Sequence, residues 1–180
     1  MKSSFACRWI LAVTGLVFVA GTAGALQQYE LIDLGTLGGF EFGGYSADIS
    51  NSGWVTGQYS PDPLTTRVFL YDGTGMRDLG TLGGSEAYGE AINSSGWVTG
   101  DRFLPDGSYH AFLYDGSTMQ DLGTLGGNTS SANDINDSGW VTGSSRLSDG
   151  TLHAFLYDGT IMQDLGLVEG ADRSIGEAIN

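Results

Sequence analysis

The chain has 180 residues, and 41% of them are hydrophobic, which is enough for a packed core and excludes a disordered chain. It carries 7 Lys and Arg residues against 21 Asp and Glu residues, a formal net charge of −14. This charge disfavours binding to nucleic acid or to an anionic lipid surface. The 30 glycines predict many turns, and the single cysteine excludes a disulfide framework.

The first 25 residues have the pattern of a secretory signal peptide. Lys2 gives a positive start, and residues 10–20 form an apolar run that is too short to span a bilayer. The small residues at 23–25 form a cleavage signature. We therefore predict export, with cleavage after Ala25 and no membrane span in the mature chain. Cleavage would also remove Cys7, which excludes thiol catalysis and cysteine-ligated zinc.

Residues 26–180 contain about three and a half copies of one repeat unit. Three motifs recur in constant order. The first, Asp-Leu-Gly-Thr-Leu-Gly-Gly, starts at Asp33, Asp78 and Asp121, and the second, Gly-Trp-Val-Thr-Gly, starts at Gly53, Gly96 and Gly139. The third, Phe-Leu-Tyr-Asp-Gly, starts at Phe69, Phe112 and Phe155. The second and third motifs keep a spacing of 43 residues. Constant order and constant spacing indicate a repeat architecture.

Each unit contains four short β-type segments and lacks helical periodicity. In the third unit these segments are residues 132–136, 140–144, 153–157 and 162–166. Glycine-containing turns join the first segment to the second and the third to the fourth, and such turns favour tight hairpins. The segment 153–157 is apolar at successive positions, so we expect both of its faces to be covered.

These features predict an all-β protein of repeated four-stranded antiparallel blades, arranged as a partial β-propeller with about three full blades and two stray strands. A 43-residue repeat fits a propeller blade and is too long for a leucine-rich repeat, although another stacked all-β array remains the alternative. The mature chain begins with a lone fourth segment at 29–35. It ends with a lone first segment at 176–180, which repeats residues 89–93. We therefore expect either a fragment of a longer chain or a chain that completes its ring by self-association.

The repeats resemble the HAF family of bacterial extracellular repeat proteins. The resemblance is carried by His-Ala-Phe-Leu-Tyr-Asp-Gly, which starts at His110 and at His153 and is followed in each case by Asp-Leu-Gly. The first unit departs from the pattern, because Arg67-Val68-Phe69 replaces His-Ala-Phe. The resemblance covers residues 28–180 and implies export and a propeller-like fold. It implies no general activity and no catalytic residue.

The recurring acidic and histidine residues fit structural roles better than catalytic ones. The aspartates of Tyr-Asp-Gly and Asp-Leu-Gly occur in every unit, whereas an active site is normally built once, and aspartates in turns accept backbone N–H groups. His110 and His153 lack the partners of a metal site, and no phosphate loop or nucleophile elbow is present. We therefore expect no catalytic residue, no metal and no cofactor. Trp54, Trp97 and Trp140 are predicted to pack in the blade core rather than to form a sugar platform.

The variable segments between the second and third strands are the candidate binding region. They are residues 58–66, 101–109 and 144–152, and the variable connection at 40–46 is expected on the same face. Variable loops on a rigid scaffold often carry function, and aromatic and arginine side chains are enriched at binding hot spots. The candidate binding residues are Tyr59, Arg102, Phe103, Tyr109 and Arg146, with Phe40 and Phe42 beside them.

The sequence thus predicts an exported, non-catalytic binding or interaction module whose partner is an extracellular protein or a glycan. Two alternatives are an extracellular glycan-active enzyme with its site at the propeller centre, and a structural component of the cell surface or matrix. The enzyme would need an acidic or histidine residue that is unique to one blade and faces the centre. Glu86, Glu90 and Glu177 are the candidates, although the last two occupy equivalent repeat positions.

Overall fold

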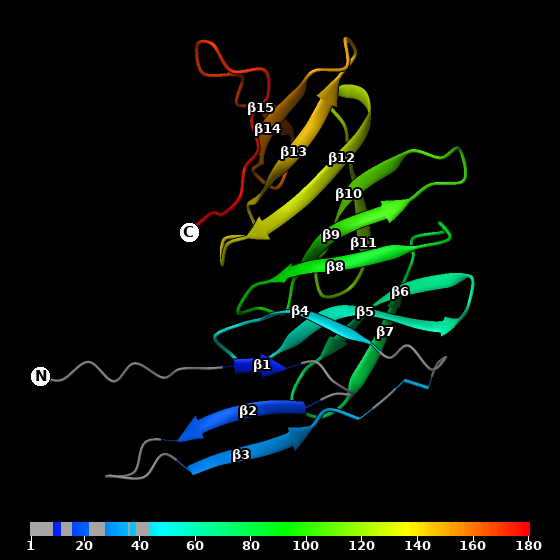
Figure 1. Ribbon diagram of the computed structural model, residues 1–180, viewed down its shortest axis with the longest axis vertical. Coiled ribbons are helices and arrows are strands. Elements are labelled where there is room, and N and C mark those ends of the chain that lie inside the picture. Colours follow the sequence, from blue (N-terminus) through cyan, green and yellow to red (C-terminus); the bar gives the residue numbers. More distant parts are fainter. Residues whose placement is uncertain (1–8, 12–15, 22–27, 36, 39–43) are drawn as a thin grey trace, which may run out of the picture.

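The computed structural model describes residues 9–11, 16–21, 28–35, 37–38 and 44–180. All regular structure in these residues is β-strand, which confirms the all-β class. Within the same residues, no helix has the length and apolar character needed to cross a membrane. The strands form antiparallel sheets that follow one another in an open row (Figure 1).

A three-stranded antiparallel sheet comes first, in the order β1 (Trp9–Leu11), β2 (Leu16–Gly21) and β3 (Gln28–Asp33). β1 and β2 lie within the predicted signal peptide. The remaining residues of that segment and the predicted cleavage site lie outside the described residues, so the signal peptide stays a prediction. β3 corresponds to the lone fourth segment expected from the sequence.

Three repeat units of four antiparallel strands follow, and in each unit every strand pairs with the next one along the chain. Unit 1 contains β4 (Tyr45–Ile49), β5 (Val55–Asp62), β6 (Thr65–Tyr71) and β7 (Met76–Gly80). Unit 2 contains β8 (Ala87–Ile92), β9 (Val98–Phe103), β10 (Tyr109–Tyr114) and β11 (Met119–Gly123). Unit 3 contains β12 (Gly126–Ile135), β13 (Val141–Leu147), β14 (Leu152–Tyr157) and β15 (Met162–Asp164).

One parallel backbone pair joins each unit to the stretch of chain that follows it, at the same repeat position: Thr66 with Glu86, Tyr109 with Thr129, and Leu152 with Arg173. The middle pair merges units 2 and 3 into one eight-stranded sheet, whereas unit 1 is a separate four-stranded sheet. The merging was not expected from the sequence, and it arises because β12 begins at Gly126 rather than at residue 132. The sheets are not closed, so the described residues form no ring.

Hydrophobic clusters alternate with the units along the row. The first cluster surrounds Phe69 in unit 1. The second contains Leu70 of unit 1 and Phe112 of unit 2, and the third contains Leu113 of unit 2 and Phe155 of unit 3. Because Phe112 and Leu113 are adjacent on β10 and belong to different clusters, both faces of this strand are buried. In β14, for which two covered faces were predicted, Ala154, Phe155 and Tyr157 are buried and Leu156 is partly exposed.

The Gly-Trp-Val-Thr-Gly motif is explained by contacts inside each unit. The threonine Oγ1 donates to the carbonyl oxygen of the phenylalanine 13 residues later, at 2.6–2.9 Å, in the pairs Thr56–Phe69, Thr99–Phe112 and Thr142–Phe155. The final glycine of the motif lies very close to the first strand. A Cβ at Gly57, Gly100 or Gly143 would lie 1.9 Å from a backbone carbonyl oxygen of that strand. Both features recur because the second strand must approach both of its neighbours closely in every unit.

The tryptophans of this motif lie where one unit meets the next. Trp54 packs against the cluster between units 1 and 2, and Trp97 packs against the cluster between units 2 and 3. Trp140 is 43% exposed, because none of the described residues covers it as unit 2 covers Trp54. The predicted core position is therefore confirmed for the first two tryptophans and is wrong for the third.

Residues 176–180 lie on unit 3 in the way that residues 89–93 lie on unit 1. The backbone N–H of Ile92 donates to Asp48 Oδ2 at 2.9 Å, and the N–H of Ile179 donates to Asp134 Oδ2 at 2.7 Å. This last segment therefore occupies the place of a first strand, as its sequence predicts.

Candidate binding face

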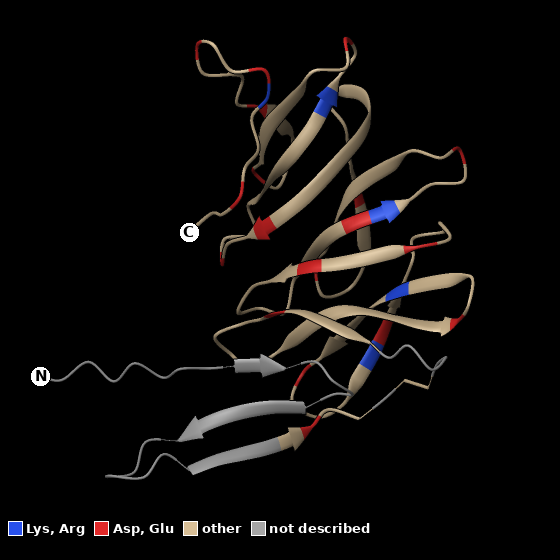
Figure 2. Ribbon diagram, viewed as in Figure 1, with Lys and Arg blue, Asp and Glu red and all other residues tan. Residues whose placement is uncertain are grey.

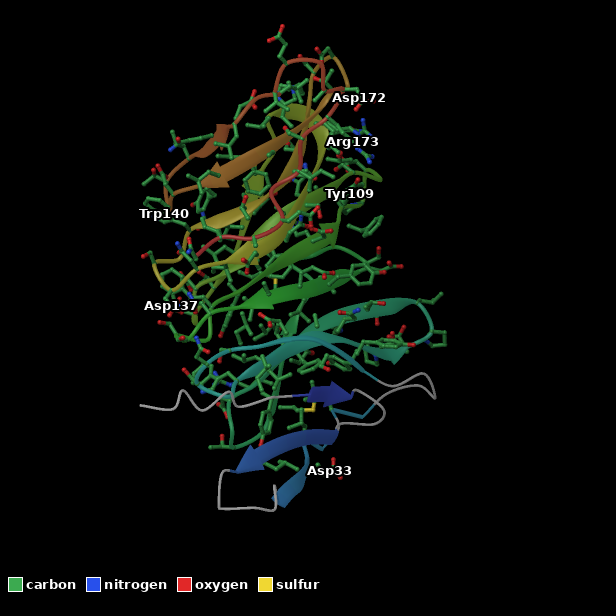
Figure 3. The ribbon with its side chains drawn as sticks, turned by 60° about the vertical axis from the view of Figure 1, so that its left-hand side comes forward. Asp33, Tyr109, Asp137, Trp140, Asp172 and Arg173 are labelled. Carbon is green, nitrogen blue, oxygen red and sulfur yellow. The ribbon has the colours of Figure 1, made fainter. Side chains whose placement is uncertain are left out.

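The connections between the second and third strands lie together at one end of the units. We call this end, formed by the turns at 63–64, 104–108 and 148–151 with the flanking strand ends, the turn face (Figure 1). The connections between units lie at the same end, since Arg102 Nη1 donates to the carbonyl oxygen of Leu82. The turns between first and second strands lie at the opposite end, where Figure 3 shows Asp137 and Trp140. The connections between second and third strands and the connection at Leu82 thus share one end of the units, as expected for the variable segments.

The strands reach further into this face than the sequence indicated. β5 continues to Asp62, β9 to Phe103 and β13 to Leu147. The backbone ladder persists there because Phe103 still pairs with Tyr109, and Arg146 still pairs with Leu152. The prediction that the five candidate binding residues lie in loops is therefore wrong. Strand ends carry them.

Two of the five candidates, Tyr59 and Arg102, are buried, with exposed fractions of 8% and 7%. Burial raises the pKa of Tyr59 to about 12, and its hydrogen bond with Asp78 adds to the rise. Arg102 forms an ion pair with Asp121. Both side chains bind to aspartates within the protein and therefore offer little surface to a partner.

Phe103 and Tyr109 remain accessible and lie side by side. Their ring centroids are 5.7 Å apart with an interplanar angle of 35°, and Phe103 is 38% exposed. Tyr88 meets Phe103 edge to face, with the centroids 6.2 Å apart. The Tyr88 hydroxyl donates to Glu86, and burial raises the pKa of this tyrosine to about 12. We call Tyr88, Phe103 and Tyr109 the aromatic cluster.

The aromatic cluster occurs in unit 2 alone. The equivalent positions hold Tyr45, Ser60 and Thr66 in unit 1, and Ser131, Arg146 and Leu152 in unit 3. Sequence reasoning missed Tyr88 because this residue lies on a first strand, which was taken as framework. Unit 1 also has a tyrosine at this position, so repetition gave no signal that would have separated Tyr88 from the framework.

Arg146 lines an open pocket of about 410 Å³ at the turn of unit 3. The lining residues are Arg146, Asp149, Gly150, Thr151, Leu152, Asp172 and Arg173, and we call the site the arginine pocket. Arg146 Nη1 donates to the carbonyl oxygen of Gly150 at 2.7 Å. Figure 3 shows Asp172 and Arg173 at the same edge of the molecule as Tyr109.

The two arginines of this pocket differ from the other arginines of the repeat units. Arg67, Arg77 and Arg102 each form an ion pair, with Asp78, Asp72 and Asp121 respectively. Across residues 44–180, Arg146 and Arg173 have no carboxylate partner within ion-pair distance. Basic residues are few among many acidic ones (Figure 2). Two unpaired cations in one pocket are therefore a distinctive feature of this chain.

A row of neighbouring strands connects the aromatic cluster to the arginine pocket. Tyr109 on β10 pairs with Thr129 on β12, and β12 pairs with β13, which carries Arg146. Neighbouring strands lie about 4.8 Å apart, so two strand spacings place the backbones of Tyr109 and Arg146 roughly 10 Å from each other. The cluster and the pocket therefore lie on neighbouring strands at the same edge of the molecule.

The recurring histidines and aspartates bind to each other. The contacts are His110 Nδ1 to Asp121 Oδ1 at 3.0 Å, His153 Nδ1 to Asp164 Oδ1 at 2.8 Å and, where arginine replaces histidine, Arg67 Nη1 to Asp78 Oδ2 at 2.7 Å. The same interaction in all three units joins the third strand to the fourth, which supports the structural interpretation. No serine hydroxyl bonds to either histidine in the described part of the chain, so a catalytic triad is not assembled there.

The aspartates of Tyr-Asp-Gly hold the turns between the third and fourth strands. Asp115 accepts the N–H of Thr118 and a hydrogen bond from the Ser117 hydroxyl, which lower its pKa to about 2. In unit 3, the Thr160 hydroxyl and the Ile161 N–H lower the pKa of Asp158 to about 2. These carboxylates serve backbone turns, as predicted.

One acidic residue that the sequence analysis did not single out is specific to unit 2. Asp101 stands where unit 1 has Gln58 and unit 3 has Ser144. Burial raises its pKa to about 6, although hydrogen bonds from the Ser131 hydroxyl at 2.9 Å and the Ala132 N–H at 3.0 Å act in the opposite direction. Because these bonds occupy both carboxylate oxygens, Asp101 serves as a link between units 2 and 3.

The three glutamates considered for catalysis have different surroundings. Glu86 accepts the hydroxyl of Tyr88, burial raises the pKa of Glu90, and Glu177 is exposed on the last segment. In the parts of the chain that the structure describes, no three His, Cys, Asp or Glu side chains form a group that could hold a metal ion. Phe40 and Phe42 lie outside the described residues.

No family model, no curated protein and no solved structure matches the chain. The resemblance to HAF repeats therefore rests on the motifs quoted above and stays a prediction.

Proposed function

We propose that the chain is an exported, non-catalytic repeat protein that binds an extracellular protein or glycan through the turn face. The observation that carries this proposal is the aromatic cluster. Framework contacts recur in every unit, whereas Tyr88, Phe103 and Tyr109 come together once. Partly exposed aromatic rings supply a large contact area, and rings held on paired strands lose little freedom on binding. Both properties favour recognition of a partner.

The proposal includes export by the signal peptide at residues 1–25. Its support is the positive start, the short apolar run and the small residues before Leu26. The full chain should be produced in a bacterium, and the N-terminus of the protein recovered outside the cytoplasm should be sequenced. We expect Leu26 as the first residue. An unprocessed chain that stays in the cytoplasm would contradict this part of the proposal.

We also propose that the units form part of a β-propeller of the HAF type. The support is a four-stranded antiparallel unit whose third strand makes a parallel backbone pair with the following stretch of chain at the same repeat position each time. Small-angle scattering combined with light scattering on the mature chain tests the arrangement. A curved arc, or a ring completed by association of several chains, is expected, and a straight elongated particle would favour the alternative of a stacked array.

The binding function is tested with the double variant Phe103→Ala/Tyr109→Ala. Affinity electrophoresis of the mature chain in gels that contain polygalacturonate, alginate, xylan or dextran gives the retention of each protein. We expect at least tenfold weaker retention of the double variant in the gels that retain the wild type, with an unchanged melting temperature. Trp140→Ala/Ile161→Ala is a control, because both of its residues are exposed apolar residues in the turns at the opposite end of unit 3.

Equal retention of the wild type and the double variant would overturn the aromatic cluster as the binding site. The same conclusion would follow if the control variant lost retention to the same extent. A wild type that no gel retains should be tested against extracellular proteins by cross-linking. Failure there as well would remove the binding function and favour a purely structural role.

A further inference from the structure

We infer that the turn face binds an acidic saccharide chain, with sugar rings packed on the aromatic cluster and a sugar carboxylate held in the arginine pocket. This inference rests on the proposed binding function and names the chemical class of its ligand. It joins two features that the repeat framework does not explain, namely a cluster found in one unit and a pocket lined by two unpaired arginines.

The arginine pocket supplies the charge selectivity. The guanidinium group presents a planar fork of N–H donors that matches a carboxylate in a bidentate geometry. The bond from Arg146 Nη1 to the carbonyl oxygen of Gly150 fixes this side chain and leaves its other donors for a ligand. Arg173 lines the same pocket and has no ion-pair partner among the described residues. The pocket thus offers two guanidinium groups that form no ion pair within the described part of the chain.

The two aspartates in the pocket favour a sugar acid over a simple inorganic anion. Asp149 Oδ1 already accepts the N–H and the hydroxyl of Thr151, at 2.9 Å and 2.6 Å. Asp172 lines the pocket beside Arg173. Carboxylates accept hydrogen bonds from hydroxyl groups and repel other anions. A ligand that carries both hydroxyls and one carboxylate on each ring satisfies both kinds of group, whereas sulfate or phosphate satisfies the arginines alone.

The distance between the two features calls for a ligand longer than one sugar. The backbones of Tyr109 and Arg146 are about 10 Å apart across two strand spacings. A monosaccharide in the pocket would leave the aromatic cluster unoccupied, whereas a chain can occupy both. Affinity should therefore rise steeply from a monomer to a tetramer, because the second contact is made within an already bound molecule.

The net charge of −14 gives this inference a further consequence. Long-range repulsion slows the approach of a polyanion, but its range shrinks to a Debye length of about 8 Å at 0.15 M salt. The contacts in the pocket act at shorter range. Binding should therefore be preserved or strengthened when salt is raised from about 0.01 M to about 0.15 M, unlike binding to a basic surface.

Isothermal titration calorimetry on the mature chain tests the inference. The probes are tetramers of galacturonate, glucuronate and mannuronate, their monomers, and the methyl esters of the tetramers, which lack the charge. We expect at least one acidic tetramer to bind at least tenfold more tightly than its ester and its monomer. Arg146→Gln and Arg173→Gln should each abolish the preference for the acid over the ester. Arg77→Gln is the matched control, because Arg77 pairs with Asp72 away from the pocket.

The outcomes separate this inference from the proposed function. If Phe103→Ala/Tyr109→Ala abolishes binding while both arginine variants keep the full preference for the acid, the arginine pocket is overturned and the binding function stands. Equal binding of an acidic tetramer and its methyl ester by the wild type would also overturn the arginine pocket and leave the binding function standing. If no tetramer binds but an extracellular protein is captured through the aromatic cluster, the saccharide assignment fails alone. If inorganic sulfate competes with the tetramer as strongly as the uronate monomers do, the assignment of a carboxylate ligand to the pocket is overturned.

Discussion

The indole of Trp54 lies where a side chain on Gly96 would have to stand. A Cβ at Gly96 would be 1.8 Å from Cζ3 of Trp54, and a Cβ at Gly139 would be 2.4 Å from Cζ3 of Trp97. Both glycines have positive φ angles, +77° and +81°. The Gly-Trp pair of each motif therefore acts across units, because the tryptophan of one unit requires the glycine of the next.

Replacing Gly96 with alanine should destabilise the protein strongly. The positive φ costs an L-residue about 1–2 kcal/mol, and displacing the indole of Trp54 adds about 1–3 kcal/mol. Gly73→Ala is the matched control, because Gly73 has a φ of +91° but nothing within 4 Å of a Cβ. Urea unfolding should give a loss of about 3 kcal/mol for Gly96→Ala and about half of that for the control. Equal losses would mean that the tryptophan contact is unimportant.

Substitution of Asp121 should cost more than the equivalent substitution in unit 3. Asp121→Asn leaves the buried Arg102 without its carboxylate, which should cost about 2–3 kcal/mol. Asp164→Asn removes only the partner of His153, so a loss of about 1 kcal/mol is expected. Thermal unfolding of both variants at pH 7 measures the difference. The reverse order would show that Arg102 does not depend on this ion pair.

Asp101 should make the stability of the protein fall as pH rises from 4 to 7. Its folded pKa is about 6, above the ordinary value of 3.8, so the folded protein keeps a proton that the unfolded chain has lost. This contribution is fully present below the unfolded pKa and is lost as pH rises through the folded pKa. Over this range it amounts to about 2 kcal/mol.

Asp101→Asn removes this pH dependence while an amide can still accept the N–H of Ala132. The stability of the variant relative to the wild type should therefore rise by about 2 kcal/mol between pH 4 and pH 7. Chemical unfolding at both pH values gives this difference directly. A difference that does not change with pH would contradict the raised pKa.

Asp134→Ala should release the last segment from unit 3. Asp134 accepts the N–H of Ile179 at 2.7 Å, and Asp48 accepts the N–H of Ile92 at 2.9 Å in the equivalent place. Hydrogen exchange at Ile179 should speed up at least tenfold in Asp134→Ala and stay unchanged in Asp48→Ala. Unchanged exchange at Ile179 in Asp134→Ala would show that other contacts hold the segment.

The sequence was sufficient for the strand pattern and the position of the turn face. Repetition carries this information, because a residue such as Thr56 or Gly57 recurs only if its contact recurs. Repetition did not reveal which side chains at the strand ends are buried, because the residues there differ between units. Tyr59 and Arg102 occupy one repeat position with different residues, which resembles the variation of a binding surface.

What buries Arg102 is the connection from the preceding unit, where the Leu82 carbonyl accepts its hydrogen bond. Contacts between units depend on how the units are placed, and a pattern within one unit does not encode that placement. The same reason applies to the parallel pair between Tyr109 and Thr129, which merges two units into one sheet. The arginine pocket escaped prediction because Arg173 follows residues 164–170, where Asp-Leu-Gly-Leu-Val-Glu-Gly departs from the Asp-Leu-Gly-Thr-Leu-Gly-Gly motif.

The contact between Trp54 and Gly96 also bears on how such a chain can evolve. Each 43-residue copy carries both halves of the joint, a tryptophan for the unit after it and a glycine for the unit before it. A gene duplication can therefore lengthen the array without the need for a new contact between units. The stability of such arrays is nearly the sum of the stabilities of the repeats and of the interfaces between neighbouring repeats. The side chains of the turn face lie outside these joints and are free to diverge in each new copy, so that one copy can acquire a ligand while the others keep the framework.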